Sequence, residues 1–565
     1  MSGNKHIIYQ TFPRLFGNFN SFLVKGGGIE VNGCGKFDSY TPKALDEIRD
    51  LGISHIWYMG VIAHSTRSDY QSYGIRKDHN AIVKGKAGSP FAIRDYYDVD
   101  PDLAVNVPNR MAEFENLVKR THDAGMKVII DFVPNHVARS YHSLMKPSYT
   151  DDLGQHDDTT KSFSPSNNFY YLPGQNLTLH FGAKEEDYEY SEFPAKVTGN
   201  DCFSASPNKN DWYETVKLNY GIDYQNGKAK YFNPVPDTWH KMLEILLFWT
   251  EKDVDGFRCD MVEMVPAEFW HWAIPRVKER KNVEFIAEVY NPALYRDYIH
   301  IGRFDYLYDK VGMYDTMRRI IRREAPTTDI TILWQQTEDI RENMLYFLEN
   351  HDEQRIASDY FADHARLGLP GLVCLATLNA NPLMIYNGQE LGEKGMDREG
   401  FSGLDGRTSI FDYWSMESVR RWANSGAFNG GQLSAEQRQI RDYYRKIINI
   451  AVNEKAISEG SFYDLAYCNN SGNPCFPADR MMAYLRKAGD ELLLILINFD
   501  DREHNVRVNI PQNAFDVMKI ADNRASRVTE LISGEESIFA LTPVCPYGAS
   551  VSAHSAGIYK FEYLQ

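Results

Sequence analysis

The sequence predicts an α/β protein: a (β/α)8 TIM barrel with an inserted domain after strand 3 and a C-terminal antiparallel β-sandwich. Three observations predict this. Short apolar strands alternate with amphipathic helices, one connection is far longer than the others, and the last part of the chain contains only strand-like patterns. Strict alternation of strands and helices is typical of a parallel sheet, and eight such units close it into a barrel. An open doubly wound sheet is the alternative, which the lack of a glycine-rich phosphate loop after the first strand disfavours.

Eight apolar segments are expected to form the barrel strands. In chain order they are residues 6–12, 55–60, 127–133, 256–260, 284–290, 304–309, 343–350 and 382–388. The third is a continuous apolar run, which is typical of a strand that is buried on both faces. Residues 43–52, 112–126, 238–254, 267–281 and 435–452 are expected to be helices, because their apolar residues recur at helical spacing.

Four segments follow from this pattern. Residues 1–137 and 227–453 are expected to form the barrel, and residues 454–565 the β-sandwich. Residues 138–226 are rich in Ser, Asn, Asp, Gly and Tyr and show little periodicity, so they are expected to form an inserted domain. This insertion leaves the carboxyl end of the third strand, which is the catalytic face of such barrels.

The composition limits the partners. The formal net charge of −16 disfavours nucleic acid or an anionic membrane as the main partner. No segment is long and apolar enough to span a membrane, and the first residues do not resemble a signal peptide. We therefore expect a cytoplasmic protein, or a periplasmic or secreted one if a leader has been removed. The sequence leaves the oligomeric state open.

Polar residues gather where the predicted strands end. They are Asp131, Asn135 and His136 after the third strand, Arg258 and Asp260 on the fourth, Glu288 on the fifth, and His351 and Asp352 after the seventh. Any one of them could simply cap a helix or form a buried hydrogen bond. The carboxyl ends of all barrel strands lie on one face, however, so together these residues predict a single site at the mouth of the barrel.

The same segments resemble the α-amylase family, glycoside hydrolase family 13. "DFVPNH", "DGFRCD", "AEVY" and "ENHD" are similar to its four signature segments, in order and in the expected strand context. The "DYY" segment at 95–97 and the "GQELG" loop at 388–392 also resemble family segments. The resemblance covers the barrel, the insertion and the C-terminal sandwich.

The resemblance implies roles for three carboxylates. Asp260 would be the nucleophile, Glu288 the general acid and then base, and Asp352 the carboxylate that stabilises the transition state and holds sugar hydroxyls. Arg258 lies two residues before Asp260, so the two side chains share one strand face. We expect Arg258 to keep Asp260 ionised by lowering its pKa, although an ion pair that only holds the barrel together is the plain alternative.

Further residues would bind the sugar. His136 and His351 resemble the family pair that hydrogen-bonds sugar hydroxyls, and Phe91 stands where the family usually has a stacking tyrosine. The implied function is a retaining hydrolase that acts on α-1,4-linked glucans or maltooligosaccharides through a covalent glycosyl-enzyme. A transglycosylase or sugar isomerase of the same clan is one alternative, and a non-catalytic carbohydrate-binding or interaction protein is another. A metal hydrolase is disfavoured, because no HxH or HExxH spacing is present.

Two features depart from the family pattern. Glu263 and Met264 stand where many α-amylases have Lys and His, which disfavours endo-hydrolysis of long polymers. Asn135 matches a calcium ligand of the family, but Lys217 stands where a companion Asp is usual, and an ammonium group has no lone pair to offer a cation. We therefore expect no required cofactor, with calcium disfavoured and the lysine taking its place electrostatically.

Overall fold

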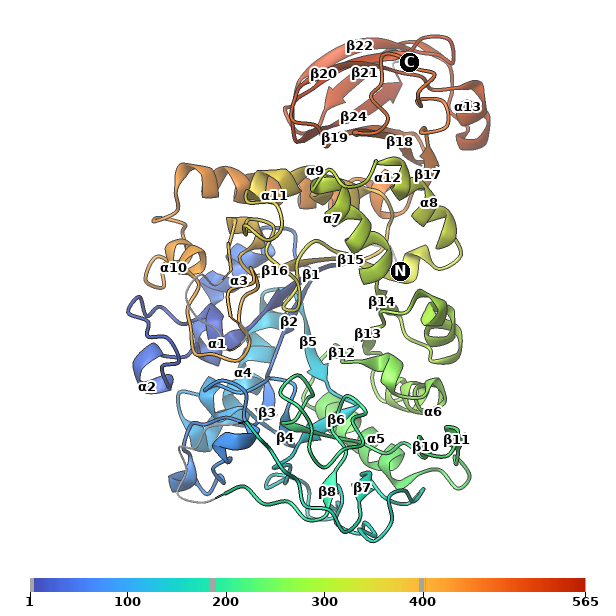
Figure 1. The fold of residues 1–565 in the computed structure, drawn as a ribbon. Coiled ribbons are helices and arrows are strands. Elements are labelled where there is room, and N and C mark those ends of the chain that lie inside the picture. Colours follow the sequence, from blue (N-terminus) through green and yellow to red (C-terminus); the bar gives the residue numbers. More distant parts are fainter. Residues whose placement is uncertain (1–4, 182–188, 396–400, 402, 564–565) are drawn as a thin grey trace.

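A closed barrel of eight parallel strands forms the centre of the molecule (Figure 1). The computed structural model describes residues 5–181, 189–395, 401 and 403–563. The barrel strands are β1 (Ile7–Thr11), β2 (His55–Tyr58), β5 (Lys127–Phe132), β12 (Gly256–Cys259), β13 (Glu284–Ala287), β14 (Tyr306–Tyr308), β15 (Met344–Phe347) and β16 (Leu383–Tyr386). Each lies within a segment that the sequence predicts, so the barrel is confirmed.

The strands follow one another around the barrel in chain order, and β16 closes it by pairing with β1, with Ile7 opposite Leu383. The predicted helices form at α3 (Pro42–Arg49), α4 (Arg110–Asp123), α5 (Asp237–Glu251), α6 (Ala267–Lys278) and α11 (Ala435–Asn453). Local signals set where they begin: the Thr41 side chain accepts a hydrogen bond from the Ala44 N–H, and Ser434 forms a capping box with Gln437. The helices cover the outside of the strands, which are therefore buried on both faces.

Small two-stranded sheets make up most of the regular structure in the long connection after β5. They pair β6 (His136–Ala138) with β9 (Thr215–Lys217), β7 (Tyr171–Leu172) with β8 (Ala195–Lys196), and β10 (Ile222–Asp223) with β11 (Ala229–Lys230). The first pair joins the two ends of the connection beside the barrel. A further two-stranded sheet pairs β3 (Ile62–His64) with β4 (Ile93–Val99). It was not predicted from the sequence, because the pairing is irregular and interrupted by bulges.

The C-terminal part is an antiparallel β-sandwich, as predicted, and lies beyond α9 and α11 at one end of Figure 1. Its larger sheet has the order β17 (Ser461–Asp464), β18 (Met481–Ala488), β19 (Glu491–Asn498), β24 (Ser555–Tyr563), β21 (Asn523–Glu530) and β22 (Glu536–Leu541). A second sheet pairs β20 (His504–Val508) with β23 (Tyr547–Val551). The sequence patterns missed β17, β21, β22 and β23, in which few residues are buried.

The strand β18 belongs to two hydrophobic cores. Met482 and Tyr484 on one face pack with the barrel core, whereas Ala483 and Leu485 on the other face pack in the core of the sandwich. Arg486, also buried, donates hydrogen bonds to backbone carbonyls that include Leu378 O at 3.0 Å and Ile457 O at 2.7 Å. Among the described residues, no helix has the length and apolar character needed to cross a membrane.

Candidate active site

Most of the polar residues predicted at the strand ends meet at the carboxyl end of the barrel. Arg258 lies on β12 and Asp260 directly after it, Glu288 directly follows β13, and His351 and Asp352 follow β15. The contacts described below join these residues into one cluster.

Arg258 is the centre of this cluster. Its side chain is fully buried. Its Nη1 donates a hydrogen bond to Asp260 Oδ1 at 2.7 Å, and its Nη2 forms an ion pair with Glu288 Oε1 at 2.8 Å. Asp131 Oδ1 lies 3.8 Å from Nη1. One guanidinium therefore holds the two central carboxyl groups side by side, within the span of its two terminal nitrogens.

Aromatic rings enclose this guanidinium. Its central carbon lies 5.2 Å from the ring centre of Trp57, 5.3 Å from that of Phe91 and 5.5 Å from that of Tyr308. Ring faces attract a cation and exclude water, so the charges of Arg258 and its carboxylates interact in surroundings of low polarity. Phe91, expected to bind substrate, thus lies against the cluster.

Arg258 does lower the pKa of Asp260, as expected, but the net shift is upward. Burial raises this pKa above its ordinary value, and the charge of Arg258 only partly opposes the rise. The cost of removing a carboxylate from water outweighs the attraction of its neighbour. The expectation for the pKa of Asp260 included the neighbouring charge but not this desolvation.

Both carboxylate oxygens of Glu288 accept hydrogen bonds. The Met261 N–H donates to Oε2 at 2.7 Å, and the Tyr290 hydroxyl donates to Oε1 at 2.7 Å. Met261 adopts a left-handed backbone conformation with φ of 43°, which is strained for this residue type and is typical of functional sites. Burial raises the pKa of Glu288, against the opposing charge of Arg258, which is the direction that a general acid requires.

Asp352 and His351 form the opposite side of the cluster. His351 Nε2 lies 3.1 Å from Asp352 Oδ2, and His351 Nδ1 lies 2.8 Å from the Gln10 side-chain amide nitrogen. Because the Gln10 amide donates, Nδ1 accepts, and the His351 proton is on Nε2, where it points to Asp352. The His351 ring also stacks on Phe91 at 5.1 Å. Burial and the charge of Glu288 raise the pKa of Asp352 to about 7.

His136 lies at the start of β6 and is buried. Its Nδ1 is 3.1 Å from the Asn135 amide nitrogen, and its ring packs at a tilt against Trp212, with ring centres 5.2 Å apart. Burial lowers the pKa of His136 to about 3, so the imidazole is neutral at physiological pH. A neutral ring can offer one N–H donor to a sugar hydroxyl.

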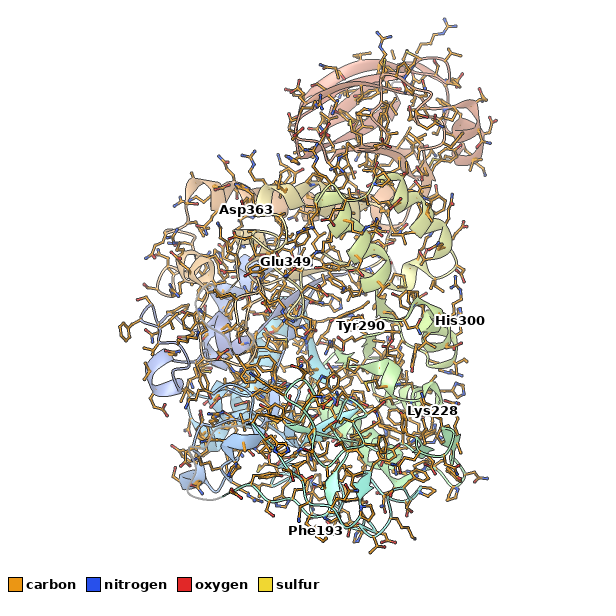
Figure 2. All side chains as sticks on the ribbon, in the orientation of Figure 1. Phe193, Lys228, Tyr290, His300, Glu349 and Asp363 are labelled. Carbon is orange, nitrogen blue, oxygen red and sulfur yellow. The ribbon has the colours of Figure 1, made fainter. Side chains whose placement is uncertain are left out.

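The residues of this network that were not predicted from the sequence include Gln10, Tyr290 and Tyr308. Tyr290 had a usable signal, since it lies two residues after Glu288, in the segment "AEVYN", and alternate residues of an extended chain share a face. Figure 2 places Tyr290 inside the barrel region, away from the C-terminal sandwich. Gln10 and Tyr308 reach the site from β1 and β14, and no local pattern relates them to it.

Tyr290→Phe should shift the pH dependence of turnover. The lost hydroxyl stabilises ionised Glu288 and lowers its pKa, so its removal should raise this pKa and move the alkaline limb of kcat to higher pH. We expect kcat at the optimum to fall less than about 10-fold, since one hydrogen bond is lost. Tyr295→Phe is the matched control, because the buried Tyr295 hydroxyl has no hydrogen-bond partner among the residues that the structure describes. An alkaline limb that stays in place or moves to lower pH would contradict the assignment.

Glu263 stabilises the loop after β13. Its Oε2 accepts hydrogen bonds from the backbone N–H groups of Tyr290 at 3.1 Å and Asn291 at 3.0 Å. The carboxylate that replaces the usual lysine is therefore engaged with the backbone beside Glu288. It holds the segment that carries Tyr290, which the sequence could not reveal.

The residues at the family's calcium position do not fit a cation. Lys217 is 1% exposed, and its Nζ lies 2.8 Å from Asn135 Oδ1 and 2.5 Å from Asp201 Oδ1. The ammonium group thus contacts the oxygens that would otherwise face a metal, and it repels any ion that approaches. Burial lowers the pKa of Lys217 and Asp201 opposes this.

We predict that stability depends on Lys217 and not on calcium. Lys217→Met should lower the free energy of unfolding by about 1–3 kcal/mol, because Asn135 Oδ1 loses a charged donor and Asp201 its counter-ion. EDTA should leave the Tm of the unaltered protein unchanged. Lys228→Met is the control, since Lys228 lies over the same Tyr224 ring as Lys217, at 5.8 Å, without these partners. A Tm that rises with calcium concentration would refute this prediction.

Comparison with known proteins agrees with this geometry. The family model described as "Alpha amylase, catalytic domain" matches residues 11–298, more than half of the chain. "Alpha-amylase 3" of Dictyoglomus thermophilum is 22% identical over 554 residues, which cover 92% of this chain and 90% of that protein. "Alpha-glucosidase" of Apis mellifera is 21% identical over 593 residues, with 93% and 92% covered.

Two other similarities are informative. "Amino acid transporter heavy chain SLC3A1" of Homo sapiens is 26% identical over 265 residues, which cover 46% of this chain and 29% of that protein. Among solved structures, the maltogenic α-amylase AmyB of Thermotoga neapolitana has a TM-score of 0.64 and 21% identity, and the whole of both chains is covered. At this identity the structural similarity supports the fold alone.

A barrel with this carboxylate cluster and these relatives defines the class of the protein, a glycoside hydrolase with a carbohydrate substrate. The chain belongs to the α-amylase family, glycoside hydrolase family 13, as the sequence motifs indicate.

Proposed function

We propose that the protein hydrolyses α-1,4-linked glucans or maltooligosaccharides with retention of configuration, through a covalent glycosyl-enzyme. The observation that carries this proposal is the shared guanidinium of Arg258, which binds Asp260 Oδ1 at 2.7 Å and Glu288 Oε1 at 2.8 Å. Double displacement requires two carboxyl groups only about 5 Å apart, whereas an inverting site leaves room for a water between them. Two groups bound to one guanidinium suit the first geometry.

In the first step, protonated Glu288 donates its proton to the glycosidic oxygen while ionised Asp260 attacks the anomeric carbon. The bond to the leaving sugar breaks, and an ester bond to Asp260 forms. The raised pKa of Glu288 favours the protonated form that this step needs. The hydrogen bond from Arg258 keeps the attacking carboxylate oriented as positive charge develops on the sugar.

In the second step, Glu288 is ionised and accepts a proton from water, which attacks the anomeric carbon and releases Asp260. The Tyr290 hydroxyl and the Met261 N–H both donate to Glu288 and stabilise this ionised form. Asp352 and His351, joined at 3.1 Å, are placed to bind hydroxyls of the sugar that is attacked. Two inversions leave the product in the α configuration.

The proposed substrate rests on the relatives and on the aromatic lining. Two relatives that align with nine-tenths or more of both chains are named α-amylase and α-glucosidase. The rings of Phe91 and Trp212 beside His351 and His136 can pack against the apolar faces of glucose units. Transfer to a second sugar shares the first step and differs only in whether water or a hydroxyl reaches the intermediate.

An interaction protein on the same fold is the second candidate, favoured by the partial similarity to the transporter heavy chain. Against it, Asp260, Glu288 and Asp352 are all present and buried or half-buried around one arginine. A binding protein has no need of two carboxyl groups held on one guanidinium.

The test is turnover of maltoheptaose, with the anomer of the first product followed by NMR. We expect the α anomer to appear first and to convert slowly to the β anomer. A β product at early times would refute retention, and no turnover at any pH would favour the interaction protein. Chromatography of products from maltoheptaose, pullulan and sucrose separates hydrolysis from transfer, because transfer yields products longer than the substrate.

A further inference from the structure

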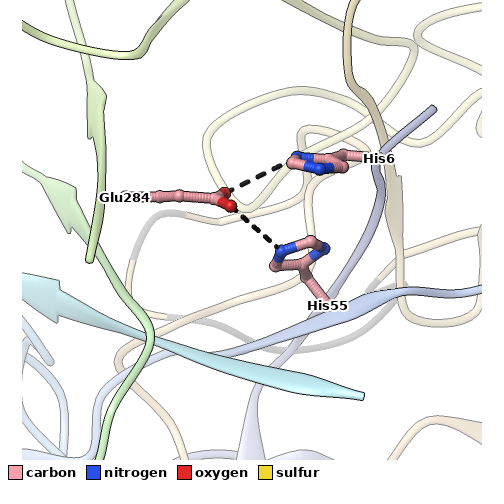
Figure 3. A group of neighbouring side chains, drawn as sticks. All are labelled: His6, His55 and Glu284. Atoms are coloured by element: carbon pink, nitrogen blue, oxygen red, sulfur yellow. Dashed lines mark ion pairs between the residues drawn. The ribbon is translucent and has the colours of Figure 1, made fainter. Parts of the chain in front are cut away.

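Three potential metal ligands meet at the end of the barrel opposite the carboxylate cluster (Figure 3). His6 precedes β1, His55 begins β2 and Glu284 begins β13. In the barrel β1 and β2 are neighbours, but β5 and β12 separate β2 from β13 on one side, and three strands separate β13 from β1 on the other. Glu284 therefore reaches both histidines across the floor of the barrel rather than along its wall.

The distances between these groups suit one bound ion. His6 Nδ1 lies 3.6 Å from Glu284 Oε2, and His55 Nε2 lies 3.5 Å from Glu284 Oε1. The three ligand atoms lie within 4.8 Å of one another. Ligands of a tetrahedral zinc ion, each 2.0–2.2 Å from the metal, are about 3.4 Å apart. The two separations between histidine and carboxylate are close to this spacing and are long for direct hydrogen bonds.

Within the part of the chain that the structure describes, two buried atoms of this group have no hydrogen-bond partner, His55 Nε2 and Glu284 Oε2. His55 is only 2% exposed. Its Nδ1 lies 2.7 Å from the Ser54 hydroxyl, whose hydrogen can go to Ile7 O, and in that arrangement His55 Nδ1–H donates to Ser54. Neutral His55 then presents the lone pair of Nε2 to a carboxylate. A cation between these two acceptors would satisfy both.

This arrangement has the second shell of a metal site. A ligand histidine usually donates its other ring N–H to a fixed oxygen, as His55 Nδ1 can to Ser54. The Tyr306 hydroxyl lies 3.2 Å from His6 Nδ1. Lys127, whose Nζ is 3.2 Å from Glu284 Oε1, is half exposed and can turn into solvent.

We propose that His6, His55 and Glu284 bind a divalent transition metal of the zinc class, with water as the fourth ligand. Two imidazoles and one carboxylate suit zinc and not the hard, oxygen-seeking calcium. The ion would join opposite walls of the barrel at its amino-terminal end. Its role would be structural, because the site lies at the other end of the barrel from Asp260 and Glu288.

The experiment uses untagged full-length protein, stripped of metal with EDTA and dialysed. Addition of Zn²⁺ should raise the Tm, and elemental analysis should find one zinc per chain. His6→Gln and Glu284→Gln should each weaken zinc binding by more than about 100-fold, since loss of a second-shell partner alone costs 10–100-fold. Both variants should keep the metal-free turnover of the unaltered protein.

His122→Gln is the matched control. His122 is 28% exposed, as His6 is 30% exposed, and it also faces carboxylates, but no second histidine among the described residues forms a metal-ligand group with it. This variant should bind zinc normally. Co²⁺ in place of zinc should give a visible tetrahedral spectrum that His6→Gln abolishes. The proposal would be overturned if zinc did not change the Tm of the unaltered protein, or if zinc raised the Tm of His6→Gln and Glu284→Gln as much as that of the unaltered protein.

Discussion

Asp260→Asn should abolish hydrolysis of maltoheptaose while leaving the fold intact. An amide cannot attack the anomeric carbon, so kcat should fall by roughly 10⁴- to 10⁶-fold, the range seen when a group at the centre of a covalent mechanism is removed. The fold should survive because Asn keeps the size of Asp260 and its amide oxygen can still accept from Arg258 Nη1. Steady-state kinetics gives the loss of turnover, and thermal unfolding checks the fold.

Two further results would make this assignment specific. In Asp260→Gly, azide should enter the vacated space and restore turnover, and the product should be the β-glycosyl azide, because one displacement inverts the configuration. Glu288→Gln is the companion variant: it should lose most activity on maltoheptaose but retain it on glucosyl fluoride, whose leaving group needs no proton. Near-normal turnover in Asp260→Asn would refute the nucleophile assignment.

Arg258→Met should have the largest effect on stability. It leaves Asp131, Asp260 and Glu288 buried together without their common cation. Loss of one partner from a buried ion pair costs about 3–5 kcal/mol, and we expect a loss of this size in the free energy of unfolding at neutral pH. Urea unfolding at a fixed pH measures it. Arg110→Met is the control, since buried Arg110 pairs with Asp98 alone.

The loss in Arg258→Met should grow with pH. Arg258 lowers the pKa of each of its three carboxyl partners, and that of Asp131 is already about 7 with the arginine present. Without it, the folded-state values rise further above the unfolded values near 4. A carboxyl group whose pKa is higher in the folded than in the unfolded state favours folding at low pH. It destabilises the folded state as the pH rises from the unfolded-state pKa to the folded-state pKa. The deficit should therefore be smaller at pH 5 than at pH 8, and equal deficits would contradict this.

The sequence predicted the parts of the fold that local pattern determines. Strands such as β5 are continuous apolar runs, and helices such as α11 have a strong periodicity and a Ser434 cap, so both could be recognised. The strand β22 could not, because three of its six residues are exposed and it packs at the edge of a sheet. Its structure depends on β21 beside it, which no local pattern reports.

The site was predictable to the extent that its residues lie in recognisable segments. The structure brings Arg258, Asp260 and Glu288 together as expected from their places at the strand ends. The raised pKa of Asp260 was not predicted, because it depends on how much water the folded chain removes. Gln10 was not predicted either, because it is 341 positions from His351 and meets it only when the barrel closes.

Because β18 belongs to both hydrophobic cores, it affects how the molecule unfolds. Residues on one face of β18 pack in the barrel core, and residues on the other face pack in the sandwich core. Separating these parts would expose Met482 and Tyr484 to water and strip Arg486 of its carbonyl partners on the barrel side. The β-sandwich therefore cannot behave as an appendage, and heating should melt catalytic barrel and sandwich together in a single cooperative event.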